Sequence, residues 1–568
     1  MTLLSGSFVV SKIAQFDFPE QWPELLPAVL ATMPHGTDAQ LHGALRILQD
    51  LVEDSLTDEQ FFTVARDIIK ACLEVALNAE RKDTHRALAV LVFGACFALM
   101  EIVQGNHKKE VRAFAEEVLQ GWVDFFKHVI MAPLPTRVVS EDLKSDSWYG
   151  PIALKVQIVK TLMKIKQVFR SLLLPHSADF FQATWQELTR VEPVYRELFL
   201  DADAQSRLED IDGLPYTLDF LVLDELDLLN QLMRAPPVQK ELEARITTAG
   251  AAHSTQWVLD LMKLLVGYSR VTSEEEGLWE IDVSLYLAEE TSVTSNYTAR
   301  TACADLLIKL GEWLSIGAME GLFAYSKELF VQPADWRLQE AALYLFTVLL
   351  TDFQETERSI SNEIAIAYSE LVGYAINVID HPIFRARGFL AGAALAQCYP
   401  PMANLLDQAV DRMIKDESEI VQVACVKAIG GLINAGVPPT KQLVIVNAME
   451  KFLQGKDLTE LNDADDLLVT LVDTLRSAIN LDTRIAISHE CKALDMLFEF
   501  AKHGAASWQV SGMVADTLMQ LASAATDPSS FSDLCARVLP LILSAYDVAN
   551  VTQDGNLLTV CLNLPRLI

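Results

Sequence analysis

The chain has 568 residues, which exceeds the size at which a single compact core stops growing, so it must form several domains or one repeat array. Its content of 51% hydrophobic and 21% charged residues excludes an intrinsically disordered chain. With 45 basic and 77 acidic residues, the formal net charge is −32, which disfavours direct binding to nucleic acid or to an anionic membrane and favours basic protein partners. The alternative interpretation is that the acidity only keeps an apolar-rich protein soluble.

The eight cysteines are widely spaced and include no C-x-x-C pair. Most of them lie among apolar residues with helical spacing, as buried free thiols do. A reducing compartment is the simplest inference. The most apolar stretch, 87–100, is closed by Glu101 and is too short to span a bilayer, so we expect a buried helix there and no membrane insertion.

The first segment with a clear pattern predicts a pair of antiparallel helices. Pro19 and Pro23 suit a turn and the first turn of a helix, which we expect to begin near Glu20. Apolar residues at three- and four-residue spacing then form one face up to Pro34, and a second apolar-faced helix follows over 41–52. Two such short helices cannot bury both of their faces alone, so the unit needs stacked copies of itself.

Four further helix pairs follow with the same character. Apolar helical faces alternate with charged, acidic or proline-containing connections, of which the connection at 131–151 is long enough to be functional or mobile. The helices are expected at 58–79 with 84–104, 108–130 with 152–174, 179–199 with 214–233, and 255–271 with 298–314.

The connection at 272–297 is the most unusual segment, and we expect an acidic inter-helix loop there. Two acidic clusters flank aromatic and aliphatic residues, and Trp279 and Tyr286 stand in polar surroundings. One interpretation is that these charges are only solvated; the other is that the loop contacts a partner. The residues expected to contact a basic partner are Glu274, Glu275, Glu276, Trp279, Glu289 and Glu290.

Three later segments match one another and show the repeat length. They begin at Trp336, Phe384 and Val421, and each opens the second helix of a pair. Their offsets of 48 and 37 residues bracket the roughly 40 to 47 residues of HEAT and armadillo units. Further helices are expected at 441–453, 463–479, 489–503, 507–522 and 531–546.

These patterns predict an all-α fold: a right-handed α-α superhelix, or α-solenoid, of HEAT/armadillo-like helical repeats. We expect one continuous array over residues 1–568, with about ten to eleven helix pairs. In such an array the second helix of each pair lines the concave side. The helix at 214–233 carries Asp224 and Asp227 on one face, so we expect these carboxylates to meet Lys and Arg of a partner. Taken singly, each acidic cluster of this kind is better explained as a solvated helix end or as a charge that favours the helix dipole, but the number of such clusters favours a partner surface.

The chain contains no recognisable catalytic or cofactor-binding motif. It lacks H-E-x-x-H, G-x-S-x-G, a strand-linked G-x-G-x-x-G and G-x-x-x-x-G-K-[ST], and its histidines and cysteines have no metal-ligand spacing. An apparent calcium loop at 201–212 fails, because Ser206 and Asp212 stand where an EF-hand needs Gly and Glu. We therefore expect no enzyme, no catalytic residue, no metal and no cofactor.

Two stretches resemble a known family. Residues 13–25, IAQFDFPEQWPEL, resemble the "IA … D-[WYF]-P-x-x-W-P-x-L" element near the amino end of importin-beta-type karyopherins. Residues 296–307, NYTARTACADLL, follow an acidic segment and resemble the importin-9 branch of that superfamily.

The resemblance implies a function. Importin-beta-type karyopherins are HEAT superhelices that bind cargo in the cytoplasm, pass nuclear pores by contacting Phe-Gly repeats of nucleoporins, and release cargo to Ran-GTP. The importin-9 branch is known for basic cargo, notably histone dimers. The resemblance thus implies a nuclear transport receptor that shuttles between cytoplasm and nucleus and binds basic, histone-like cargo on an acidic concave surface.

The position of the first motif departs from the family pattern. In the family this element follows about two earlier repeats that form much of the Ran-GTP site, and more repeats follow the last one matched here. We therefore expect a chain truncated at both ends, which leaves Ran-GTP binding open. The alternative functions are a generic HEAT-repeat scaffold without transport activity, and an export receptor.

Overall fold

The computed structural model describes residues 2–56, 58–138, 146–202, 208–247, 255–291, 297–331, 335–454, 456 and 465–563. These residues form α-helices joined by turns, and the β-type pairing found among them is an isolated antiparallel bridge between Glu209 and Pro215. The all-α, HEAT/armadillo-like architecture predicted from the repeats is confirmed. Two parts of the sequence predictions lie outside the described residues: Ser206 of the rejected calcium loop, and residues 292–296, which end the acidic segment and include Asn296 of the second motif.

The helices fall into two compact units. Unit 1 comprises Met1–Trp257 and Thr298–Lys309, and unit 2 comprises Val258–Tyr297 and Leu310–Ile568. The α-helices lying within unit 1 are α1 (Thr2–Asp17), α2 (Leu25–Thr32), α3 (Asp38–Asp50), α4 (Asp58–Leu77), α5 (Asp83–Met131), α6 (Tyr149–Val168), α7 (Ser177–Phe199), α8 (Leu218–Met233) and α9 (Pro236–Thr247). That the whole chain forms one continuous array stays a proposal.

The first helix pair begins differently from the sequence prediction. Helix α1 precedes the proline-rich turn, and the helix expected to begin near Glu20 begins at Leu25. The reason is that the amides of Gln21 and Trp22 donate hydrogen bonds back to the Asp17 carbonyl, at 2.7 and 2.9 Å, which closes a turn at the end of α1. The next helix, α3, agrees with the prediction, and Thr37 caps it in a capping box.

Helix α5 reverses its direction. The rings of Phe93 and Trp122 stack at a centroid distance of 4.1 Å although they are 29 residues apart. A straight helix would separate them by roughly 44 Å. The two helices predicted at 84–104 and 108–130 are therefore present as packed arms, with helical backbone continuing between them. The prediction that 87–100 forms a buried helix is confirmed, because most of its side chains are buried in unit 1.

Two described stretches, Asp83–Gly105 and Pro528–Thr552, are long and apolar enough to cross a membrane by composition. In the first, 61% of the most apolar window is buried inside the protein, as in the core helix of a soluble protein. In the second, 28% is buried.

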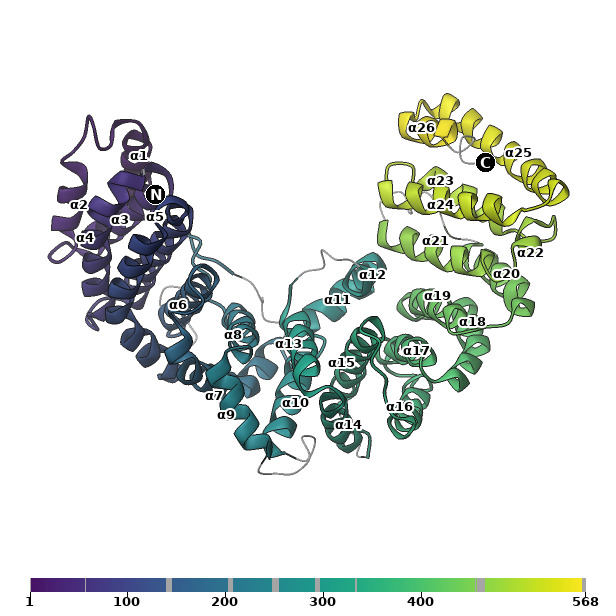
Figure 1. Cartoon of the computed structure of the whole chain (residues 1–568), viewed down its shortest axis with the longest axis horizontal. Helices are drawn as coiled ribbons and strands as arrows, with labels where there is room; N and C mark the ends of the chain where they lie inside the picture. Colours follow the sequence, from purple (N-terminus) through teal and green to yellow (C-terminus); the bar gives the residue numbers. More distant parts are fainter. Residues whose placement is uncertain are drawn as a thin grey trace. The chain divides into compact units, whose positions relative to one another are not determined.

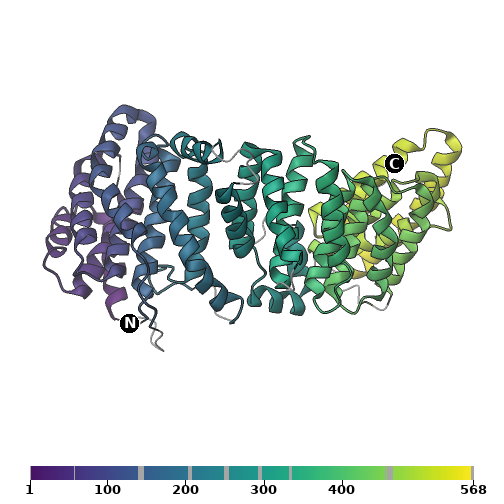
Figure 2. The ribbon, with the colours of Figure 1, turned by 90° about the horizontal axis from the view of Figure 1, so that it is seen from below.

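Unit 2 is a regular stack of helix pairs (Figures 1 and 2). The helices α15 (Trp336–Glu355), α17 (Pro382–Ala396), α19 (Glu419–Asn434) and α21 (Asp465–Ile479) pack one against the next in chain order, as the three matched segments predicted for the second helices of successive pairs. Short helices α22 and α26 complete the stack. Helices α10 and α13 are shared between the units, and the α-helices from α10 onward are α10 (Gln256–Tyr268), α11 (Ser273–Ile281), α12 (Val283–Thr291), α13 (Ala299–Leu314), α14 (Ile316–Val331), α15 (Trp336–Glu355), α16 (Asn362–Ala375), α17 (Pro382–Ala396), α18 (Leu406–Lys415), α19 (Glu419–Asn434), α20 (Gln442–Leu453), α21 (Asp465–Ile479), α22 (Thr483–Ile487), α23 (Ala493–His503), α24 (Trp508–Ala524), α25 (Pro528–Thr552) and α26 (Gly555–Asn563).

The acidic segment predicted as a loop is helical over its described part. Thr272 accepts from the amide of Glu275, and the Glu275 carboxylate accepts from the amide of Thr272 at 2.8 Å, so a capping box starts α11. One residue later than the end of α11, the Asp282 carboxylate accepts from the Ser284 amide at 2.8 Å and caps α12. The acidic residues that suggested a solvated loop therefore act partly as helix caps.

Candidate functional site

Helices α11 and α12 form a small helical hairpin with an aromatic core. Trp279 of α11 is 5% exposed, and its ring meets that of the buried Tyr286 of α12 edge to face at 5.3 Å. Trp279, which we expected to contact a basic partner, and Tyr286 therefore form the core of the hairpin. Their polar neighbours in sequence point to other sides, because successive residues of a helix face different directions.

Ion pairs attach the hairpin to the helix stack of unit 2. The Glu276 carboxylate lies 2.5 Å from Nη2 of Arg337 at the start of α15. The Glu290 carboxylate accepts hydrogen bonds from both terminal nitrogens of Arg387 on α17, with Nη1 at 3.0 Å from Oε2. Lys427 of α19 also donates to the backbone carbonyl of Glu290. Two of the glutamates predicted to meet a partner thus bind basic residues of this chain.

The remaining predicted glutamates differ in exposure. Glu275 is half-buried and belongs to the capping box, Glu289 is half-buried, and Glu274 is exposed at the first turn of α11. The structure therefore brings the predicted residues of 272–290 together on one hairpin but leaves mainly Glu274 at its surface. Whether they contact cargo stays a prediction.

The outer side of the hairpin carries residues that the sequence interpretation missed. Leu278, Ile281 and Leu285 are 46%, 85% and 43% exposed. Glu280 and Asp282 lie between them in sequence and are also exposed. Apolar residues at such spacing signal a helical face, but sequence alone assigns that face to a core. We call these exposed residues, together with Glu274, the hairpin tip: Glu274, Leu278, Glu280, Ile281, Asp282 and Leu285.

The carboxylates of α8 that we expected to meet a partner do not form an exposed face, because Asp224 is buried and Asp227 is half-buried. Asp224 is 9% exposed, and burial raises its pKa to about 7, against the opposing effect of Lys160 and with a further rise from Asp227. Its neighbour Glu225 is fully buried, and burial raises the pKa of that carboxyl well above its usual range. Helix α8 packs against both α6 and α7, which covers most of its circumference. Asp227 is half-buried beside it.

A buried ion pair lies in the same region of unit 1. The Lys155 ammonium is 2.8 Å from the Glu187 carboxylate and donates to the carbonyls of Ile130 and Ala132 at 3.2 and 2.6 Å. These bonds tie α6 to α7 and to the end of α5. The charges in this part of unit 1 therefore hold helices together.

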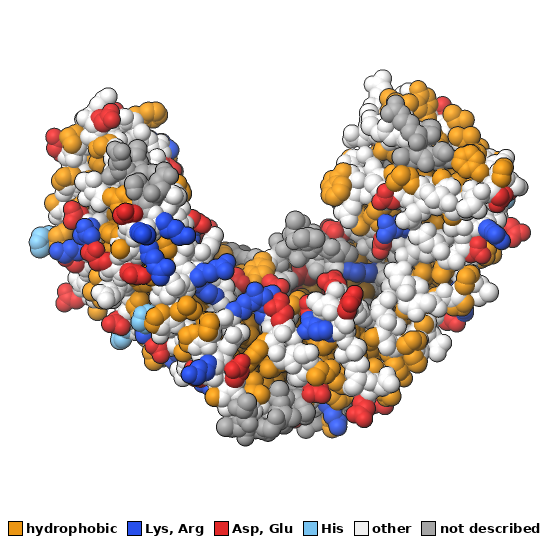
Figure 3. Space-filling view, viewed as in Figure 1, with side chains coloured by type: hydrophobic (Ala, Val, Ile, Leu, Met, Phe, Trp, Pro, Cys, Tyr) orange, Lys and Arg blue, Asp and Glu red, His pale blue; other side chains and the backbone are white. Residues whose placement is uncertain are grey.

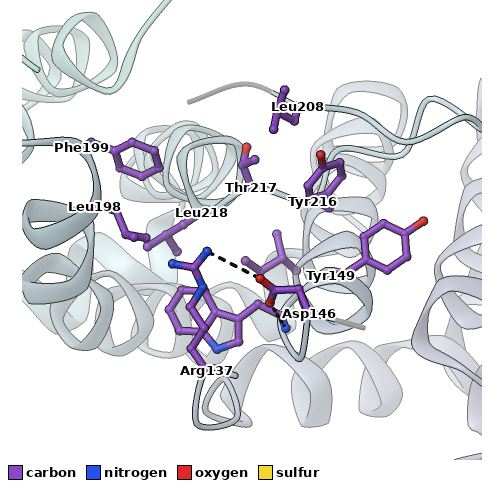
Figure 4. Close-up of a pocket in the computed structure, with 11 residues that line it drawn as sticks. Arg137, Asp146, Tyr149, Leu198, Phe199, Leu208, Tyr216, Thr217 and Leu218 are labelled. Carbon is purple, nitrogen blue, oxygen red and sulfur yellow. Dashed lines mark hydrogen bonds and ion pairs between the residues drawn. The ribbon is translucent and has the colours of Figure 1, made fainter. Parts of the chain in front are cut away.

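An apolar pocket of about 300 Å³ opens between the starts of α6 and α8, the end of α7 and the turns that precede α6 and α8 (Figure 4). Figure 4 shows the Arg137 guanidinium directed at the Asp146 carboxylate, 3.6 Å away, beside the apolar walls. Arg137 also lies over the Trp148 ring, whose indole N–H donates to the Pro135 carbonyl at 2.7 Å. The other lining residues are Tyr149, Ile152, Leu198, Phe199, Leu208, Tyr216, Thr217 and Leu218.

The turn over 208–217 that forms one wall of this pocket is held by its own aspartates. Asp210 accepts from the Tyr149 hydroxyl and from the amides of Asp212 and Leu214, and Asp212 contacts Nε2 of His42 at 2.8 Å. Asp212 therefore has a structural partner where an EF-hand would have a calcium ligand. Within the described ranges, no group of three or more His, Cys, Asp or Glu side chains is arranged to hold a metal ion.

The amino-acid sequence matches known proteins over most of its length. The family model for the central HEAT repeats of importin-9 matches residues 252–505. Importin subunit beta-5 of Schizosaccharomyces pombe is 25% identical over 565 residues, which cover 97% of this chain and 54% of that relative.

The chain is a karyopherin of the importin-beta superfamily, near importin-9. Solved karyopherins share its fold. The exportin Cse1 in its cargo-free, cytoplasmic state has a TM-score of 0.57 at 15% identity, covering 96% of this chain and 58% of that one. Kap121p bound to Nup53p has a TM-score of 0.54 at 14% identity, covering 98% of this chain and 46% of that one. This karyopherin thus spans about half the length of the curated relative it matches.

The surface of this karyopherin mixes both signs of charge. Figure 3 shows Lys and Arg side chains interspersed with Asp and Glu, without a continuous acidic sheet on the face in view. On this face the acidic side chains are therefore separated by basic ones.

Proposed function

We propose that this karyopherin is a nuclear transport receptor that binds basic, histone-like protein cargo and carries it through nuclear pores, shuttling between cytoplasm and nucleus. The observation that carries the proposal is the hairpin tip, where Glu274, Glu280 and Asp282 remain exposed on a hairpin whose other side is anchored by ion pairs. The formal net charge of −32 adds long-range attraction for basic proteins. The relatives, an importin subunit and an exportin, support a role in transport rather than in catalysis.

We propose that the pocket of Figure 4 takes the phenylalanine side chains of Phe-Gly nucleoporins. Its volume of about 300 Å³ accommodates an aromatic ring, and its walls are aromatic and aliphatic. A nucleoporin, Nup53p, is the partner of Kap121p in one solved relative. Burying one Phe side chain contributes about 2 kcal/mol, so single pockets bind weakly and a transport receptor needs several.

Ran-GTP is the proposed release signal, as in the family that the motif at 13–25 resembles. The chain spans about half of its curated relative. The test therefore measures cargo binding and the response to Ran-GTP as two separate properties. The alternative is a scaffold that binds proteins without responding to Ran-GTP.

Binding of the chain to an immobilised core-histone dimer tests the proposal. We expect binding that weakens steeply between about 0.1 and about 0.5 M NaCl, because its attraction is between exposed charges. Addition of Ran-GTP should lower the bound fraction if release is controlled by it; unchanged binding favours the scaffold. Absence of binding at about 0.1 M NaCl contradicts the proposal.

The pocket is tested with a Phe-Gly repeat peptide. Tyr216 forms one wall and packs against Tyr149 at 5.3 Å between ring centroids. Substituting Tyr216→Ala should remove most binding, whereas Tyr216→Phe keeps the wall and should keep binding. Equal affinity of both variants and the wild-type chain would place the Phe-Gly site elsewhere.

A further inference from the structure

We infer that the hairpin tip recognises cargo segments in which a large apolar side chain is flanked by Lys or Arg. This inference rests on the proposed function and specifies the partner class of the same surface. It assigns a contact role to Leu278, Ile281 and Leu285, in addition to the acidic side chains.

The apolar residues of the tip are arranged on one side. Glu274, Leu278 and Ile281 follow one another at four- and three-residue spacing, which places them along one face of α11. The opposite face holds Glu276 and Trp279, which turn inward to Arg337 and Tyr286. The exposed apolar face is therefore a consequence of how the hairpin is anchored.

The hairpin presents this face in a fixed conformation. The capping box at Thr272, the Trp279–Tyr286 contact and the Glu290–Arg387 pair each restrain a different part of it. A pre-organised surface loses little conformational entropy on binding, so a small contact area can yield useful affinity. Three large apolar side chains within eight residues, exposed on such a surface, mark an interaction site more than scattered ones do.

The charges around the apolar face indicate its occupant. Glu274 lies one turn before Leu278 on this face, and the exposed Asp282 follows Ile281 at the end of α11. Glu280, one turn after Glu276, is exposed on the adjoining side of the same helix end. A basic segment would pair with these carboxylates while its apolar residue covers Ile281. A second copy of the same chain would bring a formal charge of −32 against an equal charge, which disfavours self-association through this face.

Two matched probes and three variants test the inference. The probes are basic peptides of about 15 residues, long enough to span the tip, one with a central Leu and one with Ser in its place. The apolar variant combines Ile281→Ser with Leu285→Ser, and the charge variant combines Glu274→Gln with Glu280→Gln. The control is Ile379→Ser, which removes another strongly exposed isoleucine side chain of unit 2, 75% exposed against 85% for Ile281.

We expect the Leu peptide to bind the wild-type chain about tenfold more tightly than the Ser peptide, the equivalent of burying one apolar side chain. The apolar variant should erase that difference, and the control should keep it. The charge variant should weaken both peptides and flatten their salt dependence, leaving the Leu preference intact.

Two results would overturn the inference: an unchanged Leu preference in the apolar variant, or sedimentation showing that Ile281→Ser abolishes a dimer of the wild-type chain. If the wild-type chain binds neither the basic peptides nor the histone dimer, that result would instead contradict the proposed function. Hydrogen exchange of α11 and α12 checks that the variants keep the hairpin folded.

Discussion

Arg387 and Glu290 lie 97 residues apart in sequence and form a two-pronged ion pair inside unit 2, with Arg387 Nη1 at 3.0 Å from Glu290 Oε2. The same guanidinium donates through Nε to Glu340 at 2.9 Å, so one buried arginine joins α12, α15 and α17. Glu290, which the sequence suggests as a partner contact, therefore stabilises the packing of these three helices.

Breaking this pair should loosen the hairpin. Glu290→Gln leaves the buried Arg387 guanidinium with one carboxylate in place of two, which should lower the free energy of unfolding of the region by about 3 kcal/mol. Hydrogen exchange over α11 and α12 measures the loss. Glu280→Gln, the same change at an exposed position of α11, should leave exchange unchanged, and equal effects of the two would refute the anchoring role.

The cap of α11 makes a smaller contribution. Thr272→Ala removes the acceptor for the Glu275 amide and should cost about 1 kcal/mol, with faster exchange confined to the first turn of α11. Thr272→Ser keeps the hydroxyl and should behave like the wild-type chain. Loss of stability with both variants would mean that the methyl group, not the cap, matters.

Asp224 should make the stability of unit 1 depend on pH. Burial raises its pKa to about 7 in the folded chain, against an ordinary value of 3.8 in the unfolded chain. The folded chain thus holds a proton that the unfolded chain has released, so this contribution to stability falls as pH rises from about 4 to about 7 and stays low above it. Asp224→Asn keeps the neutral form at every pH.

Thermal unfolding checks this expectation. The variant should match the wild-type chain at about pH 5 and unfold at higher temperature at about pH 8, because only the wild-type chain then carries a buried charge. Asp124→Asn, at an exposed position of α5, is the control and should show no such pH-dependent gain. A wild-type advantage at about pH 8 would show that the ionised Asp224 is stabilised by its surroundings.

The glutamates of 274–290 should separate into two functional groups. Glu276→Gln removes the carboxylate that pairs with Arg337 across α11 and α15, and should reduce stability while leaving the salt dependence of histone binding nearly unchanged. Glu274→Gln with Glu280→Gln should do the opposite, because these side chains are exposed. Histone binding measured at several salt concentrations, beside thermal unfolding, distinguishes the groups; identical profiles would contradict the division.

Helix class and repeat spacing were predictable from local pattern. The starts of α15, α17 and α19 follow from three matched segments, and Asp335 caps the first of them as its side chain suggests. The start of α2 was not predictable, because backbone bonds to Asp17 set the end of the preceding turn. The helical state of 272–290 was missed because its acidic residues suit a solvated loop and a helix start equally well.

The amino-acid sequence by itself determined the helical repeats and the strongly negative charge, since these depend on periodicity and composition along the chain. The likeness to karyopherins came instead from the motifs at 13–25 and 296–307. Only the tertiary structure decided which acidic and apolar residues of the hairpin face outward. A short helix with polar and apolar residues on several sides can pack by more than one face. The choice is made by the half-buried Arg337 and the buried Arg387, which are remote in sequence from α11 and α12 and each pair with a glutamate of the hairpin. The buried Arg387 guanidinium is stable only when a carboxylate meets it.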